Sequence, residues 1–534
     1  FQIINLLMAS APSSIYCAIT MVMVFLVEEP GEFTCVVNDD FEKQYQVLDR
    51  CTIFELSSGQ NRSCIELLGT ATRFAYANSS KESTLTSDFD LVCERSAWRE
   101  HASASFLFGG MLGTTILSYF SDRVGRRKAF LLSLTISVVV NSASAVAPRY
   151  FIFLALRFVA GFMLGGNVCI GNVMMCEVVA PRMREFMTIV SAVFWVSGYF
   201  LAGVARIHLG NWRWVYFFCT APGLIMLPLY FKYFQESLQW QVCSGRKEAI
   251  ARHIQRAMRV NKMRINVHEC LTEPNEHPSK HANNSKSIFT LILRTPALLY
   301  FFILLSFIVI VMNLTYWALS LFGAVPLSEH RMTAFFLSGI IEIPSSLIAM
   351  ILMKLMNRRP IVCVMFVLTA VSMTIAVVAP GFLHGEDTKA AVTMVFPLLA
   401  KMFNAVVWSV LPLAISEMTP TVIRNTFSGG VYFCGEAGSV AAPYLESLNR
   451  FGANTASSLI ALLAGLCALS VLTIPETKGT HLGSGMDTFD EGPLLRFISR
   501  TFRSKSDSEI SMVKLDSSPI ESIDVPEKYD ETTR

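Results

Sequence analysis

Charged residues are scarce in this sequence. Asp, Glu, Lys and Arg make up 16% of its 534 residues, whereas soluble domains contain about a quarter. The sequence also lacks the phosphate-cradling pattern GxxxxGK[ST] and the hydrolase patterns GxSxG and HExxH. It has no CxxC or His-rich spacing typical of a metal site, and no feature of nucleic-acid binding. These absences argue against an enzyme, an ATP-driven pump and a metal centre, and we expect no cofactor.

Apolar sequence is what the chain has in abundance. Hydrophobic residues make up 52% of it, with a mean hydropathy of +0.46. A membrane-spanning helix needs about 20 mostly apolar residues, and twelve such runs occur. They lie near residues 3–27, 102–120, 129–147, 150–175, 186–205, 212–234, 297–322, 331–353, 361–380, 391–415, 427–446 and 454–474. The first run begins directly after Phe1, so we expect a cytoplasmic segment before this sequence.

The basic residues of the short loops follow the even-numbered runs. They are Arg123, Arg126, Arg127, Lys128, Arg182, Arg184, Lys354, Arg358, Arg359 and Arg424. Cytoplasmic loops carry the excess of Lys and Arg, which predicts that both termini are cytoplasmic. The polar segment 235–290 falls on the same side. Its nearly regular Lys and Arg spacing predicts surface helices near the lipid headgroups.

Residues 28–97 are then extracellular, and their composition agrees. Four cysteines lie there: Cys35, Cys51, Cys64 and Cys93. Four cysteines in an oxidising compartment allow three pairings, among which the sequence does not choose. Asn61 and Asn78 stand in glycosylation sequons of the same loop.

Short charged motifs recur in the two halves of the chain. Glu177 and Arg184 are seven residues apart, and Glu417 and Arg424 repeat this spacing 240 residues later. Glu236 and Glu476 are also 240 residues apart. We therefore predict an all-α membrane protein of two pseudo-symmetric six-helix bundles, residues 1–234 and 291–480, with a linker at 235–290 and a disordered tail at 481–534.

Several motifs together resemble a known family. SDRVGRRK at 121–128 is similar to the loop signature of the major facilitator superfamily. More specific strings are SDFDLVCERSAW at 87–98, NWRW at 211–214, IEIPSS at 341–346, EMTPTVIRN at 417–425 and IPETKGTHL at 474–482. These resemble the organic cation and organic anion transporter family. The resemblance implies the major facilitator fold with twelve spanning helices in the plasma membrane, and a small organic ion as substrate.

The charged motif residues at the cytoplasmic helix ends are candidates for gating. Ion pairs there can latch the two bundles when the inside is closed, because buried pairs serve switching better than net stability. The candidates are Asp122, Arg123, Gly125, Arg126, Arg127, Glu177, Arg184, Glu236, Glu417, Arg424 and Glu476.

The chain departs from the family pattern at several loop positions. They are Ser118, Gln235, Leu238, Gln239, Lys354 and Asn357. The departures put the latch of the second half in doubt. We expect a divergent carrier, with a non-transporting receptor-like relative as an alternative.

Glu436, in the run 427–446, is the main substrate-site candidate. A carboxylate at the centre of a spanning helix costs about 2.5–3.5 kcal/mol and usually faces a water-filled cavity with a partner. By the resemblance, cation carriers place an acid at this position and anion or carnitine carriers an Arg. The partner is then a cationic substrate; the alternatives are protonation or an ion pair with Arg157 or Lys401. Glu342 is a second intramembrane acid, interpreted as structural or coupling.

Ammonium ligands also prefer aromatic faces. Candidate cavity residues are Phe194, Trp195, Tyr316, Trp317, Tyr432 and Phe433. We therefore predict a facilitative uniporter for small organic cations that works by alternating access without ATP. The alternative is an organic anion or zwitterion exchanger, in which Arg157 or Lys401 supplies the positive field.

Overall fold

The predicted apolar runs fold as helices. The computed structural model describes residues 2–27, 33–38, 44–56, 59–69, 72–76, 83–178, 184–244, 247–261, 295–321, 331–419, 423–452 and 454–476. Within these residues, ten helical segments are long and apolar enough to cross a membrane. The eleventh and twelfth runs are also helical, although α19 carries charged residues and several glycines and α20 is shorter.

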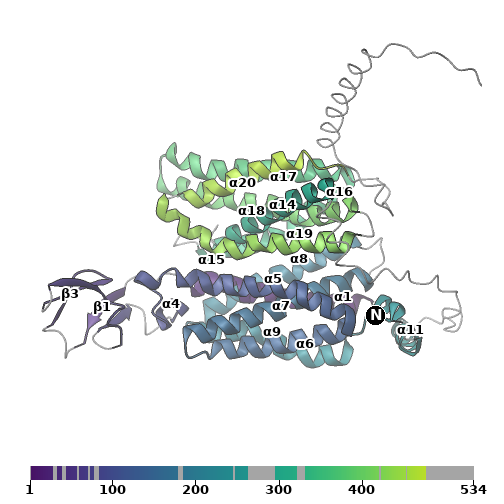
Figure 1. Ribbon diagram of the computed structural model, residues 1–534, viewed down its shortest axis with the longest axis horizontal. Coiled ribbons are helices and arrows are strands. Elements are labelled where there is room, and N and C mark those ends of the chain that lie inside the picture. Colours follow the sequence, from purple (N-terminus) through teal and green to yellow (C-terminus); the bar gives the residue numbers. More distant parts are fainter. Residues whose placement is uncertain are drawn as a thin grey trace, which may run out of the picture.

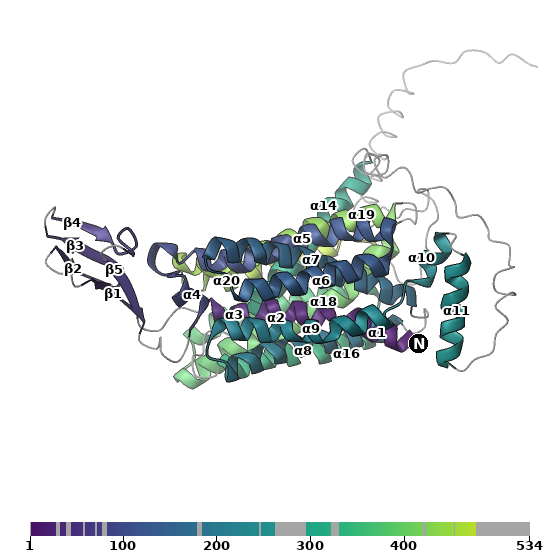
Figure 2. The ribbon, with the colours of Figure 1, turned by 90° about the horizontal axis from the view of Figure 1, so that it is seen from below.

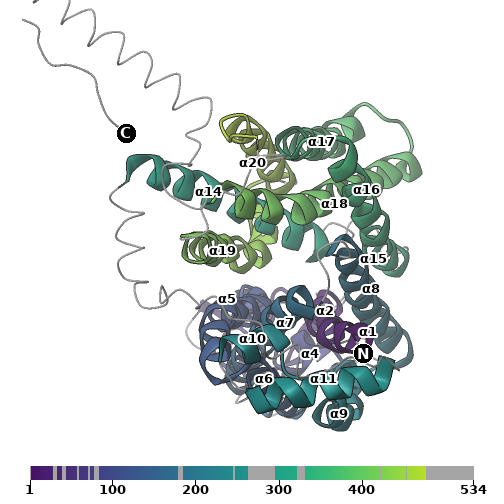
Figure 3. The same ribbon diagram turned by 90° about the vertical axis from the view of Figure 1, so that its right-hand side faces the viewer.

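The first six runs form one group of helices and the last six form another, as Figures 1 and 3 show. The first group contains α1 (Gln2–Ser10), α2 (Pro12–Met21), α3 (Met23–Leu26), α5 (Trp98–Val124), α6 (Arg126–Ala145), α7 (Tyr150–Val178), α8 (Arg184–His208) and α9 (Trp212–Tyr233). The second contains α14 (Pro296–Leu321), α15 (Arg331–Ile340), α16 (Glu342–Leu355), α17 (Arg358–Val378), α18 (Glu386–Met418), α19 (Arg424–Ala441) and α20 (Thr455–Val471). Helices α5 and α8 of the first half face α19 and α15–α16 of the second.

Two small antiparallel sheets project from one end of the bundle, here called the strand end (Figure 1). One pairs β1 (Phe33–Val37) with β5 (Thr72–Tyr76), and the other orders β2 (Tyr45–Val47), β3 (Thr52–Glu55) and β4 (Gln60–Ser63). Disulfides join Cys35 to Cys64 and Cys51 to Cys93, one of the three pairings that the sequence allows. A few buried side chains are too little core for so small a unit, which explains its reliance on disulfides.

The strand unit is tied to the bundle through two of the motifs quoted above. Asp88, at the end of α4 (Leu85–Asp88), accepts hydrogen bonds from Trp212 Nε1 at 3.1 Å and Arg213 Nη2 at 2.7 Å. On the strand side, the Tyr76 hydroxyl donates to Asp90 at 2.9 Å. Burial raises the pKa of Asp90. Asn61 lies exposed on β4, whereas Asn78 is outside the described residues.

Aromatic packing joins the two halves at the strand end. The ring of Phe335 on α15 lies 4.6 Å from that of Phe25 and 5.3 Å from that of Tyr199. Phe336 packs on Phe200 at 5.4 Å. One apolar core contains residues of both halves here. At the opposite end, the loop end, the described residues of each half form a separate core.

The segment between the halves is helical where it is described. A short helix, α10 (Leu238–Cys243), is followed by α11 (Lys247–Asn261), which lies across the loop end (Figure 2). The remainder of the predicted linker, the tail 481–534, and the side chains of Arg184 and Arg424 lie outside the described residues.

Glycines set the distance between α14 and α19. A Cβ on Gly438 would overlap the carbonyl oxygen of Ile310, and one on Gly435 would overlap the side chain of Val309. A Cβ on Gly429, in the same helix, would meet nothing within 4 Å. The glycines of α19 therefore differ in role.

Replacing Gly438 with Ala should lower the free energy of unfolding by about 1–3 kcal/mol, because backbone must move to admit the methyl group. Gly429→Ala is the matched control, and it should be neutral or stabilising by up to about 1 kcal/mol. Thermal unfolding of the purified variants in one detergent measures both. Equal midpoints would show that the α14–α19 contact is not close-packed.

Candidate functional site

Aromatic side chains from both halves meet between the bundles. Trp195 of α8 lies 6.1 Å from Trp317 of α14, centroid to centroid, and Tyr16 of α2 lies 5.8 Å from Trp195 and 6.4 Å from Trp317. The ring centroid of Tyr316, the residue before Trp317, lies 6.0 Å from that of Trp408 on α18. Three predicted residues, Trp195, Tyr316 and Trp317, are thus brought together. Tyr16 and Trp408 were not predicted, since nothing in their apolar runs distinguishes them.

The other predicted aromatic residues lie outside this cluster. Phe194 and Phe433 are half-buried, and in the described part of the chain neither ring stacks on another aromatic ring. Tyr432 packs against the core of the second half.

Glu436 lies on α19, where this helix faces α5 of the first half. It accepts a hydrogen bond from Ser439 Oγ at 2.7 Å. Its carboxylate interacts electrostatically with the side chains of Tyr16 on α2 and Cys169 on α7, both in the first half. Among the described residues, no basic side chain pairs with it. The acid is therefore uncompensated in the described part of the protein.

The predicted alternative partners of Glu436 are engaged elsewhere, so an ion pair with Arg157 or Lys401 is wrong for this conformation. Lys401 Nζ, fully buried on α18, lies 2.8 Å from Glu342 Oε1 on α16. The same ammonium donates to Tyr199 Oη at 2.7 Å and to the carbonyl oxygen of Ser338 at 2.8 Å. The interpretation of Glu342 as structural or coupling is consistent with this pair.

A hydrogen-bonded chain connects this buried pair to the aromatic cluster. Trp195 Nε1 donates to Tyr316 Oη at 2.8 Å, and Tyr316 donates to Glu342 Oε1 at 2.8 Å. Trp195 and Tyr199 belong to the first half, whereas Tyr316, Glu342 and Lys401 belong to the second. The network therefore bridges the halves at two points, which the sequence did not reveal because its members are far apart along the chain.

Arg157 of α7 is fully buried within the first half. Its guanidinium donates to the carbonyl oxygens of Ala102 and Ile19 at 2.9 and 3.2 Å and lies 4.7 Å from the Phe106 ring. It also donates to Tyr216 Oη at 3.3 Å. Carbonyl dipoles and ring faces thus solvate this cation.

The charged motif of the first half forms a compact cluster at the loop end. Arg126 binds Glu177 through Nε and Nη2, at 3.0 and 2.9 Å, and also pairs with Asp122. The Arg127 amide donates to Glu236 Oε1 at 2.9 Å. Gly125 joins α5 to α6 with φ +116°, where a Cβ would lie 2.8 Å from Glu236 Oε2. These gating candidates therefore contact one another within one half.

The second half repeats this arrangement despite its divergent loop. Arg358 Nη2 lies 3.6 Å from Glu417, and its amide donates to Glu476 Oε1 at 3.0 Å. These residues correspond to Arg126, Glu177 and Glu236. The arginine and both acids of the second half are therefore in contact without an Asp at position 354.

Residues 235–240, which include three of the departures from the family pattern, cap α10 and contact the end of α5. Ser237 caps α10 by accepting from the Trp240 amide at 3.3 Å, and Trp240 Nε1 donates to the carbonyl oxygen of Asp122 at 2.9 Å. Arg123 is exposed over the Tyr119 ring at 4.4 Å. None of these contacts spans the two halves.

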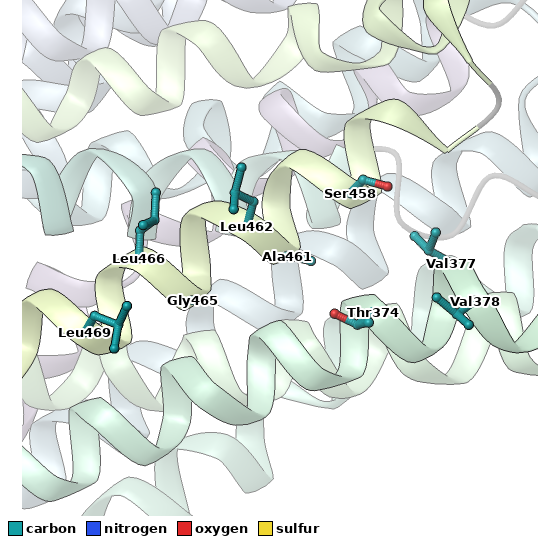
Figure 4. A pocket seen from close by; sticks show the side chains of 9 residues that line it. All are labelled: Thr374, Val377, Val378, Ser458, Ala461, Leu462, Gly465, Leu466 and Leu469. Carbon is teal, nitrogen blue, oxygen red and sulfur yellow. The ribbon is translucent and has the colours of Figure 1, made fainter.

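A groove of about 500 Å³ lies between α17 and α20 (Figure 4). Its lining is apolar except for Thr374 and Ser458, which lie toward the strand end. It contains no charged residue and none of the predicted substrate-site residues. An ion has no counter-charge in this groove, so it is not the candidate ion site.

The family model described as "Sugar (and other) transporter" matches residues 46–485. The chain belongs to this family. The structure of the Escherichia coli xylose transporter XylE, in a partially occluded inward-open conformation, superposes with a TM-score of 0.60. It has 14% identity and covers 90% of this chain and 100% of its own. The predicted major facilitator fold is therefore confirmed.

Several curated proteins similar to this chain are named organic cation transporters or members of solute carrier family 22. An organic cation transporter protein of Drosophila melanogaster is 25% identical over 79% of this chain and 75% of its own length. Solute carrier family 22 member 7 of Mus musculus is 26% identical over 76% of this chain and 74% of its own. The family resemblance predicted from the motifs is thus confirmed.

Proposed function

We propose that this protein carries small organic ions, preferably cations, across the plasma membrane by alternating access as a facilitative uniporter. The observation that carries the proposal is Glu436, a carboxylate on a spanning helix that faces the other half and has no basic partner among the described residues. An acid in that setting needs a counter-ion. The named organic cation transporter among the relatives supports the same substrate class.

The aromatic cluster supplies the remaining chemistry of the proposed site. Tyr16 lies within range of the Glu436 charge and packs against Trp195 and Trp317. Ring faces attract ammonium groups through their quadrupoles, most strongly when both partners are desolvated. A cation held between Glu436 and these rings would contact both halves, so its binding could favour their movement around it.

We further propose that both termini and the loop end are cytoplasmic, as the positions of the loop arginines favour. The shared core at the strand end and the separate cores at the loop end then correspond to an inward-facing state. The charged clusters lie within single halves in this state. Contacts between the clusters, when the loop end closes, would make them the proposed gate.

The alternative anion or zwitterion exchanger is less well supported. Lys401 is neutralised by Glu342, and Arg157 is enclosed by carbonyl groups of its own half. Neither residue presents a free positive charge to the space beside Glu436. A receptor-like relative would bind the same cation without flux.

Uptake of radiolabelled tetraethylammonium into cells that express the protein, with an organic anion in parallel, tests the proposal. We expect uptake of the cation alone, and less accumulation when the cells are depolarised. The membrane potential contributes about 2.3 kcal/mol per charge per 100 mV. Accumulation that is unchanged by depolarisation would favour electroneutral exchange. Uptake of the anion alone would overturn the assignment of a cationic substrate.

A further inference from the structure

Helix α11 presents one strongly basic face. Its sequence, KEAIARHIQRAMRVN, contains four basic residues and one acid, Glu248. Arg252, Arg256 and Arg259 have the spacing i, i+4, i+7, which places them on one side of a helix, and all three are exposed. Burial and the charge of Arg256 lower the pKa of His253, so Lys247 and the three arginines carry the positive charge of this helix at neutral pH.

The helix also lies in the orientation of a membrane-surface helix. In Figure 2, α11 runs across the loop end at right angles to the spanning helices, which places it parallel to the membrane plane. Figure 3, which looks onto the loop end, shows it in front of the ends of α6 and α9 at the rim of the first half. Arg256 Nη2 lies 3.5 Å from the carbonyl oxygen of Lys232, so α11 lies beside the last turn of α9.

Exposed aromatic residues mark the headgroup level at this same end. Tyr233 is 46% exposed beside Lys232, whose Nζ lies 5.2 Å from the ring centroid, and Tyr119 is 59% exposed beneath Arg123. Tyrosines with neighbouring cations are typical of the membrane–water interface. Because α11 lies beside the turn that contains Lys232, we infer that it lies at the level of the lipid phosphates.

We propose that the face formed by Arg252, Arg256 and Arg259 is a binding site for the headgroups of anionic phospholipids. The arginine forks match phosphate oxygens, which they bind by paired hydrogen bonds. The half-buried opposite face, with Ile250, Ile254 and Ala257, points away from the arginines. An amphipathic helix of this composition binds anionic surfaces by charge together with apolar contact.

Binding of short-chain phosphatidylinositol 4,5-bisphosphate to the purified full-length protein in a neutral detergent tests this site. Each surface arginine contributes about fivefold to such binding. The triple variant R252Q/R256Q/R259Q should therefore bind the lipid at least tenfold more weakly than the wild type, and short-chain phosphatidylcholine should bind neither.

The matched control is R50Q/R73Q/R450Q, which removes three exposed arginines at the strand end and should bind like the wild type. The charge-preserving variant R252K/R256K/R259K should bind more tightly than the glutamine variant but more weakly than the wild type, because lysine keeps the charge and loses the paired hydrogen bonds. Unchanged binding in the triple glutamine variant would overturn the proposal, as would an equal loss in the strand-end control. The assay contains no organic ion, so its outcome is independent of the proposed transport.

Discussion

Glu436→Gln should abolish tetraethylammonium uptake while leaving the protein folded and at the cell surface. Glutamine has nearly the size of glutamate and can still accept the hydrogen bond from Ser439. What it removes is the charge that the substrate would neutralise. Losing one partner of a desolvated charge pair costs about 2–5 kcal/mol, so we expect uptake efficiency to fall at least about 30-fold.

The stability of the same variant separates a binding acid from a structural one. In the absence of substrate, an unpaired carboxylate on a spanning helix is unfavourable by about 2.5–3.5 kcal/mol. Glu436→Gln should therefore raise the unfolding temperature of the purified protein while it lowers transport. A structural acid would give the opposite result, a lower unfolding temperature.

Glu386→Gln is the matched control for charge removal. Glu386 begins α18 at the strand end and its side chain is 90% exposed in its pair with Lys389. Exposed pairs contribute about 0–1 kcal/mol, so uptake and stability should both stay near those of the wild type. Wild-type uptake by the Glu436 variant, measured per molecule at the surface, would exclude Glu436 from the substrate site.

Lys401→Met should destabilise the protein by about 3–5 kcal/mol. The substitution preserves most of the side-chain volume but leaves the Glu342 carboxylate buried without its cation, and breaking a buried pair has a cost of this size. Glu342→Gln should be similarly harmful, since it leaves the Lys401 ammonium fully buried with only neutral partners.

The double variant Glu342→Gln/Lys401→Met distinguishes an ion pair from two independent packing sites. Neutral replacement of both members of a buried pair is often harmless or stabilising. The double variant should therefore be more stable than either single variant in thermal unfolding of the detergent-solubilised protein. Additive losses, with the double variant the least stable, would refute coupling between the two residues.

The Glu436 and Glu342 sites also show which features of the candidate site could be predicted from the sequence and which could not. Both Glu436 and Glu342 stand out as acids in apolar runs, so the candidates were visible from hydropathy alone. Hydropathy did not show which of the two acids pairs with Lys401, because Lys401 is 35 residues before Glu436 and 59 residues after Glu342. Lys401 pairs with Glu342 because α16 and α18 cross, and no local sequence pattern predicts that contact between helices.

The sequence by itself determined the apolar segments that fold as helices and the class of fold. A bilayer forces every backbone group of a span to bond internally, so length and hydropathy suffice. The repeated Glu and Arg motifs likewise predicted equivalent helix ends in the two halves. Only the tertiary structure decided the Cys35–Cys64 and Cys51–Cys93 pairing, the joining of the halves at the strand end, and the partner of Lys401. These depend on which surfaces pack in three dimensions, where a few kcal/mol choose among arrangements that share one hydrophobic pattern.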